Sequence, residues 1–207
     1  MSTNASIVTN VNIHDYFHAQ IESSLSHQHV PLGVSAVDYL TRLLADFSNP
    51  HQLFQQTPEG LDFKPLALHY ADAVHADGPR QRNLALKRLG DIALFISGMF
   101  AGSLARKVVD VDYYAAMGSA AYRDLHGILS THFGDPAISS PFAELAGKFL
   151  VLVDVFAEVA EASHLGSRHD VLRNYEIWLR TDSPRALRKL QCQGIVPARA
   201  NVSLVRH

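Results

Sequence analysis

The chain has 207 residues, of which 47% are hydrophobic and 18% charged, and its formal net charge is −2. This composition is that of an ordinary globular protein long enough to bury a core, and it favours one domain. A single cysteine, Cys192, excludes an internal disulfide and a zinc site built from cysteines, and it fits a reducing compartment.

Charge is unevenly distributed along the chain. Residues 1–167 hold 10 Lys and Arg against 17 Asp and Glu, whereas residues 168–207 hold 8 against 3. This asymmetry favours an acidic partner for the C-terminal part, or docking of that part on the acidic body of its own chain or of another copy.

No segment has the features of a membrane span or a secretory leader. The longest uncharged apolar run, 92–105, has 14 residues, whereas a bilayer requires about 20. The N-terminus lacks a charged region followed by an apolar stretch and a cleavage site. We therefore expect a cytoplasmic protein with no membrane contact.

The first part of the chain reads as a series of helices separated by breakers. Asn12 and Ser35 are candidate N-caps, and Pro31, Pro50 and Gly60 lie in the connections. The predicted elements in chain order are helices at 13–27 and 36–47, a short helical piece near 51–55, a loop through 58–60 and a helix at 63–77.

The stretch 80–100 predicts the central helix of the protein. Its apolar side chains share an arc of roughly 200°, wider than the ~100° stripe of a surface helix. The residues on this arc are Leu84, Ala85, Leu86, Leu89, Ile92, Ala93, Phe95, Ile96, Met99 and Phe100. We expect such a helix to contact neighbours on more than one side, and Gly90 and Gly98 to allow close approach of another backbone.

The remainder of the chain continues the helical pattern. The predicted elements are a helix at 111–131, a long helix at 141–163 started by Ser140-Pro141, helices at 169–180 and 184–193, and a tail at 195–207. No series of strands with hairpin signals is apparent. The sequence therefore predicts an all-α bundle of seven to nine helices around 80–100, with one domain at 1–194.

Three acid–histidine pairs have the spacing of helical metal ligands. They are Asp15–His18, Asp72–His75 and Glu161–His164. An acid and a histidine three residues apart on facing helices hold two metal ions in ferritin-like bundles. The pairs therefore make a helical metalloprotein or an oxygenase-like enzyme one hypothesis, although the sequence identifies no particular cofactor.

Helical phase argues against this hypothesis. In the helix predicted at 63–77, Leu66, Tyr70, Ala73 and Val74 define the inner face, and Asp72 points away from it. Glu161 likewise lies opposite the apolar face of its own helix. Metal-binding carboxylates must point inward, so the phase favours a solvated face over a metal site.

Two further sets of charged residues stand out. Asp91 follows Lys87 by four residues, which predicts an intrahelical ion pair; the alternative is a buried acid that pairs with Arg106 or Arg123. Arg185, Arg188 and Lys189 form a basic cluster that could track the phosphates of a nucleic acid or another anionic partner. No helix-turn-helix pattern accompanies this cluster.

Two segments carry a resemblance to other sequences. They are the run from Leu89 to Phe100 with the Asp110-Val-Asp-Tyr-Tyr114 motif, and the segment from Tyr39 to Phe47. Together they resemble a pattern in uncharacterised bacterial proteins of similar length, over about the middle half of the chain. The resemblance implies a soluble bacterial protein and carries over no functional residue.

Abundant apolar faces and few converging polar residues favour a non-catalytic interaction or scaffold protein, with a protein partner or a second copy of itself as its ligand. The alternatives are the metalloprotein using Asp72, His75, Glu161 and His164, and the anionic-partner binder using the basic C-terminal segment.

Overall fold

The structure is a computed structural model whose described residues belong mainly to helices. It describes residues 12–53, 55–57, 60–62, 64–100, 111–133, 135–162, 175, 178, 187–188, 190–191 and 195. The helices are α1 (Ile13–His27), α2 (Val34–Phe47), α3 (Pro50–Leu53), α4 (Leu66–Val74), α5 (Pro79–Met99), α7 (Val111–Phe133), α8 (Pro136–Gly147) and α9 (Phe149–Ala162). The predicted all-α class is confirmed.

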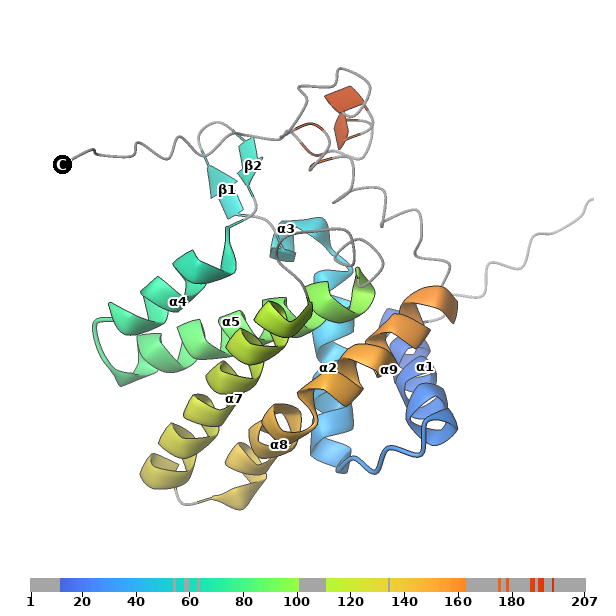
Figure 1. The fold of residues 1–207 in the computed structure, drawn as a ribbon, viewed down its shortest axis with the longest axis horizontal. Helices are drawn as coiled ribbons and strands as arrows, with labels where there is room; N and C mark the ends of the chain where they lie inside the picture. The colour runs from blue at the N-terminus through green and yellow to red at the C-terminus, as the bar shows by residue number, and fades with distance from the viewer. Residues whose placement is uncertain are drawn as a thin grey trace, which may run out of the picture.

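Helix α5 occupies the middle of the bundle, as its wide apolar arc predicts. It contacts α2, α4, α7 and α9, and Figure 1 shows these helices arranged around it. Every residue from Leu89 to Met99 is buried, which follows from contact with helices on several sides. The N-terminal half differs: Leu84, expected in the core, is 59% exposed.

Small residues let neighbouring helices approach α5 closely. A Cβ placed on Gly98 would lie 2.3 Å from the Cβ of Phe156 and 3.1 Å from the carbonyl oxygen of Val153. A Cβ on Gly118 of α7 would lie 2.8 Å from the Cβ of Ala93. The prediction of a close backbone approach therefore holds at Gly98, where α9 crosses α5.

A small hairpin interrupts the helical series. β1 (Gln55–Thr57) pairs antiparallel with β2 (Gly60–Asp62), in the register Gln55 with Asp62 and Thr57 with Gly60. The predicted helical piece at 51–55 therefore ends at Leu53, and strands flank the predicted loop. Sequence reasoning predicted the loop from Pro58 and Gly60 but not the two short strands beside it.

The predicted helix 141–163 is two helices. Asp135 caps α8 by accepting a hydrogen bond from the backbone N–H of Ala137 at 2.8 Å, and Pro136 occupies the first turn. This cap-plus-proline signal precedes Ser140-Pro141 by five residues, so α8 starts earlier and Pro141 lies inside it. Lys148 ends α8, and α9 begins at the next residue.

Helix α4 is shorter than predicted and turns a different face inward. Leu66 and Ala73 are buried as expected, but Tyr70 and Val74 are exposed, and His69 is buried in their place. Beyond α9, Ile195, where the tail was predicted to begin, is buried. Among the described residues, no helix is long and apolar enough to cross a bilayer.

Candidate functional site

Among the described residues, polar side chains from three helices converge on Asp91 of α5. Asp91 is only 6% exposed, because the half of α5 on which it lies is enclosed on all sides. A carboxylate in such a position is costly unless hydrogen bonds and a positive charge compensate for the lost water. The surrounding residues supply both.

Three side chains from three helices donate hydrogen bonds to Asp91. The hydroxyl of Tyr122, on α7, donates to Oδ1 at 2.8 Å, and the hydroxyl of Tyr39, on α2, donates to the same oxygen. Lys87 Nζ donates to Oδ2 at 2.8 Å. The predicted intrahelical ion pair is therefore present, and the carboxylate is also buried, as the alternative expected.

The partners of Asp91 that the structure describes are two tyrosines and Lys87, and Arg123 is not among them. Arg123 is exposed on α7, and Arg106 lies outside the described residues. Sequence spacing could identify Lys87 because it lies one turn from Asp91 on the same helix. It could not identify Tyr39 or Tyr122, which lie 52 and 31 residues away from Asp91.

Aromatic packing fixes the two tyrosines. Phe142 of α8 lies edge-on to Tyr39 with ring centroids 5.2 Å apart, and its centroid is 5.9 Å from that of Tyr122. The Lys87 ammonium lies 4.9 Å from the centroid of the Tyr39 ring, within the range of a cation–π contact. Gly90 makes room for Tyr122, because a Cβ there would lie 2.5 Å from Cε1 of its ring.

Both tyrosines donate to Asp91 and remain protonated. Burial, followed by the charge of Asp91, raises the pKa of Tyr39 and of Tyr122 well above the usual value of 10.0. Their phenols therefore keep their protons across the physiological pH range. The Asp91 cluster, defined as Tyr39, Lys87, Asp91 and Tyr122, is a set of groups in which the carboxylate and both phenols have partners, whereas the half-exposed Lys87 ammonium uses one of its N–H groups.

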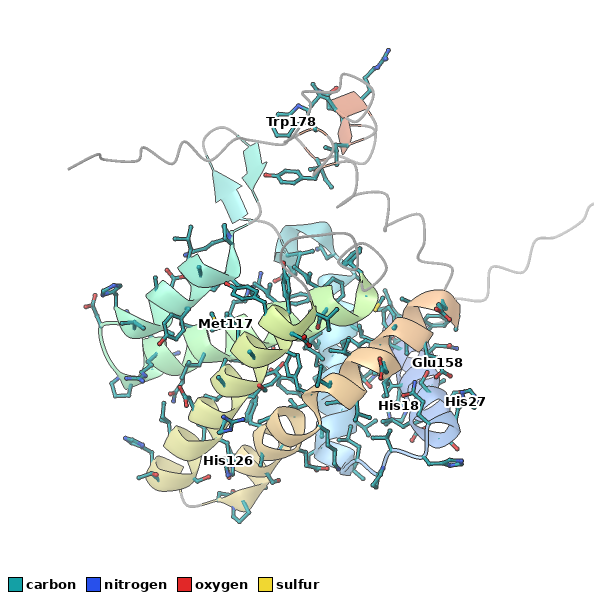
Figure 2. All side chains as sticks on the ribbon, in the orientation of Figure 1. His18, His27, Met117, His126, Glu158 and Trp178 are labelled. Atoms are coloured by element: carbon teal, nitrogen blue, oxygen red, sulfur yellow. The ribbon has the colours of Figure 1, made fainter. Side chains whose placement is uncertain are left out.

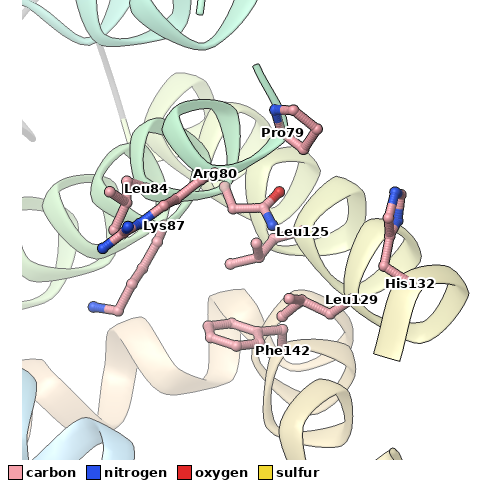
Figure 3. A pocket seen from close by; sticks show the side chains of 9 residues that line it. Pro79, Arg80, Leu84, Lys87, Leu125, Leu129, His132 and Phe142 are labelled. Atoms are coloured by element: carbon pink, nitrogen blue, oxygen red, sulfur yellow. The ribbon is translucent and has the colours of Figure 1, made fainter. Parts of the chain in front are cut away.

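A pocket of about 510 Å³ opens beside this cluster. It lies between the N-terminal half of α5 and the C-terminal half of α7, with Phe142 of α8 contributing a third side (Figure 3). Its lining residues are Pro79, Arg80, Asn83, Leu84, Lys87, Leu125, Leu129, His132 and Phe142. The volume is in the range usual for small-molecule sites.

The pocket combines apolar walls with a cationic margin. Arg80, Asn83, Leu84 and Lys87 recur at spacings of three and four, so they form one stripe on α5. Leu125, Leu129 and His132 form the matching stripe on α7. None of the lining residues is acidic, and Lys87 and Phe142 also belong to or contact the Asp91 cluster.

The candidate metal residues do not converge in the described part of the chain. Asp72 is exposed on α4 and pairs with Lys64; His75 and Glu161 are exposed as well, and His164 lies outside the described residues. No group of three or more His, Cys, Asp or Glu side chains among the described residues is placed to hold a metal ion.

The basic cluster lies mostly beyond the described residues. Arg188 is exposed in a helical stretch, whereas Arg185 and Lys189 are outside the described part of the chain. Their hypothesised role as an anion-binding surface remains a prediction.

Two histidines that sequence reasoning passed over have defined environments. Burial, with smaller contributions from the charges of Lys64 and Arg88, lowers the pKa of His69 from 6.5 to about 4. His27 Nδ1 lies 3.0 Å from Glu158 Oε1 (Figure 2). Gln28 donates to the other carboxylate oxygen of Glu158 at 2.7 Å. The hydrogen bond from Gln28 is the main cause of a lowered pKa at Glu158. These contacts join α1 to α9.

Comparison of the chain with protein-family models, with curated proteins and with solved structures finds no match. The resemblance based on the Leu89–Phe100 run therefore remains a prediction.

Proposed function

We propose that the protein is a non-catalytic binding protein and that its ligand occupies the pocket between α5 and α7. One observation carries this proposal: an open apolar pocket lies next to a polar cluster whose carboxylate and phenols already have partners. Leu84, Leu125, Leu129 and Phe142 offer apolar contact to a ligand, and burial of that surface would provide the binding free energy.

The Asp91 cluster supports a binding role over a catalytic one. A general acid or base requires a group that can change its protonation near neutral pH. The pKa values of Tyr39 and Tyr122 are raised far from that range, and Asp91 already accepts three hydrogen bonds. We assign the cluster the role of fixing Lys87 and the aromatic wall of the pocket.

The single cysteine and the bacterial resemblance support a bacterial, cytoplasmic setting for this role, which we propose with it.

The test uses Nile red, a neutral dye whose fluorescence increases in apolar sites. We expect saturable binding to the wild-type chain. Leu84→Gln places a polar group on the pocket wall, and because about 50 Å² of apolar contact is then lost, the dissociation constant should rise about eightfold. Leu84 is 59% exposed, so the substitution should leave the fold intact.

The matched control is Leu68→Gln. Leu68 is a leucine of similar exposure, 49%, on α4 and outside the pocket. Its variant should bind Nile red as the wild type does. Absence of saturable binding, or an equal effect of both substitutions, would contradict the proposal.

A second candidate function is self-association. Leu150 and Val151 are adjacent, large and exposed on α9, and apolar surface of this kind favours a protein contact. The expected result is a concentration-dependent increase in mass by light scattering that Leu150→Gln reduces. A constant monomer mass at all concentrations would argue against it.

A further inference from the structure

We propose that the pocket takes an amphipathic acid: a ligand with an apolar body and one anionic head group, held at Arg80 and Lys87. This inference rests on the proposed function and adds the chemical class of the ligand. The two rest on different observations, since binding follows from the apolar walls and the anionic head from the charges at the margin.

The charge balance of the pocket favours a single negative charge. Arg80 and Lys87 line it and no acidic side chain does. The Lys87 charge is balanced by Asp91, whereas the ion pairs of the described residues do not include Arg80. One positive charge therefore remains uncompensated at the margin, which matches a monoanion.

The geometry places two donors together. In Figure 3 the side chains of Arg80 and Lys87 extend toward the same side of the pocket. Lys87 is held there by its bond to Asp91 and its contact with the Tyr39 ring, and it keeps further N–H groups for a ligand. Arg80 supplies the planar fork that pairs with carboxylates in a bidentate manner.

The rest of the lining suits the apolar body. Leu84 of α5, Leu125 and Leu129 of α7 and Phe142 of α8 line one pocket. Leu84 is 59% exposed, whereas the other three side chains are buried and offer only a small open apolar area. An alkyl or aryl chain attached to the head group would cover Leu84 and that area, which a free inorganic anion cannot do. The ligand is therefore amphipathic.

The experiment compares decanoate, decanol and decylamine, which share an alkyl chain and differ in the charge of the head group. Displacement of Nile red is measured at concentrations below those at which micelles form. We expect decanoate to bind about tenfold more tightly than decanol, as a charge-assisted contact of this kind would give. Decylamine should bind more weakly than either.

Two arginine variants isolate the head-group contact. Arg80→Gln should raise the dissociation constant of decanoate about fivefold and leave that of decanol unchanged. Arg82→Gln removes the same charge from the same helix at an exposed position outside the pocket, so it should have no effect. Equal binding of decanoate and decanol, or equal effects of the two variants, would overturn the acid proposal.

Failure of this inference is distinguishable from failure of the proposed function. If Nile red and all three alkyl probes bind at a site sensitive to Leu84→Gln but without preference for the acid, the pocket binds and the anionic class is wrong. If decylamine binds best, the charge assignment is reversed. If neither the dye nor any probe binds, both proposals fall.

Discussion

Asp91 shows how a charged residue is accommodated inside a helical bundle. Its carboxylate accepts hydrogen bonds from the buried phenol of Tyr122, the half-buried phenol of Tyr39 and one ammonium, and those donors come from α2, α5 and α7. Removal of the carboxylate is costly because both phenols and the ammonium lose their acceptor. Asp91 therefore holds three helices in one relative position.

We predict that Asp91→Ala lowers the free energy of unfolding by about 3 kcal/mol, since buried hydroxyl groups lose their acceptor. Urea unfolding followed by circular dichroism measures it. Tyr39→Phe should cost about 1 kcal/mol alone. In a chain that carries Tyr39→Phe and Tyr122→Phe, the further cost of Asp91→Ala should be smaller. Equal costs in both backgrounds would show that the three groups do not act together.

The lowered pKa of His69 predicts that the stability of the protein depends on pH. Its pKa is lowered by burial from 6.5 to about 4 in the folded chain. Between these values the unfolded chain binds a proton at His69 that the folded chain does not, so the free energy of unfolding decreases as pH falls from 6.5 toward 4. Below that range both states are protonated and this contribution no longer changes.

The measurement is the urea midpoint of wild type and His69→Gln between neutral pH and pH 4. Carboxylates also contribute over part of this range, so the informative quantity is the difference between the two proteins. The variant should show the shallower decline. Parallel curves would mean that His69 titrates alike in the folded and unfolded chains.

At the scale of elements, glycine positions report how closely the helices pack. Gly90→Ala should destabilise the protein by about 2 kcal/mol, although alanine is the better helix former. The new Cβ would lie 2.5 Å from the Tyr122 ring, and that ring is held by Asp91 and by contacts with Phe142 and Phe149.

Gly127→Ala is the matched comparison. Gly127 lies inside α7, is exposed, and has no atom within 4 Å of an added Cβ. Helix propensity alone then applies, and the variant should be more stable by about 1 kcal/mol. The midpoint temperatures of thermal unfolding should shift in opposite directions in the two variants. A shift in the same direction would contradict the packing explanation for Gly90.

Periodicity predicted α1, α2, α5 and α7 to within a few residues, because each has an apolar repeat bounded by a break in the pattern. The predicted Asn12 cap of α1 is confirmed, whereas Ser35 lies inside α2, which begins after Gly33. The start of α8 was predicted five residues too late, because two cap-plus-proline signals compete there, Asp135-Pro136 and Ser140-Pro141. In α4 the buried side chain is His69, a residue type that hydropathy does not assign to a core.

The candidate site was less accessible to such reasoning. Periodicity places Asp91 and Lys87 on one helix. It does not predict which other helices pack against Asp91, or which of their residues lie opposite it. Tyr39, Tyr122 and Phe142 meet at Asp91 only through tertiary packing. The pocket has the same origin, since Leu84 fits the apolar arc of α5 and becomes exposed because α7 and α8 leave a space there.

For the molecule as a whole, α5 should be the most resistant part of the described fold. Its residues from Leu89 to Met99 are all buried and contact four other helices, so their amides are expected to open only by global unfolding. Native-state hydrogen exchange should give these amides the highest protection, and α4, with three large exposed apolar residues, lower values. Faster exchange in α5 than in α4 would contradict its central role.

The contacts of α1 and α2 have a consequence for synthesis on the ribosome. His27 binds Glu158 across 131 residues, and the backbone N–H of Gly33 donates to Glu144 across 111 residues. Neither partner exists when the first two helices emerge, so the parts of their apolar faces that α8 and α9 cover remain exposed until those helices have been translated. A nascent chain halted before Glu144 should accordingly bind chaperones and be cleaved rapidly by proteases, whereas one extended past α9 should resist both.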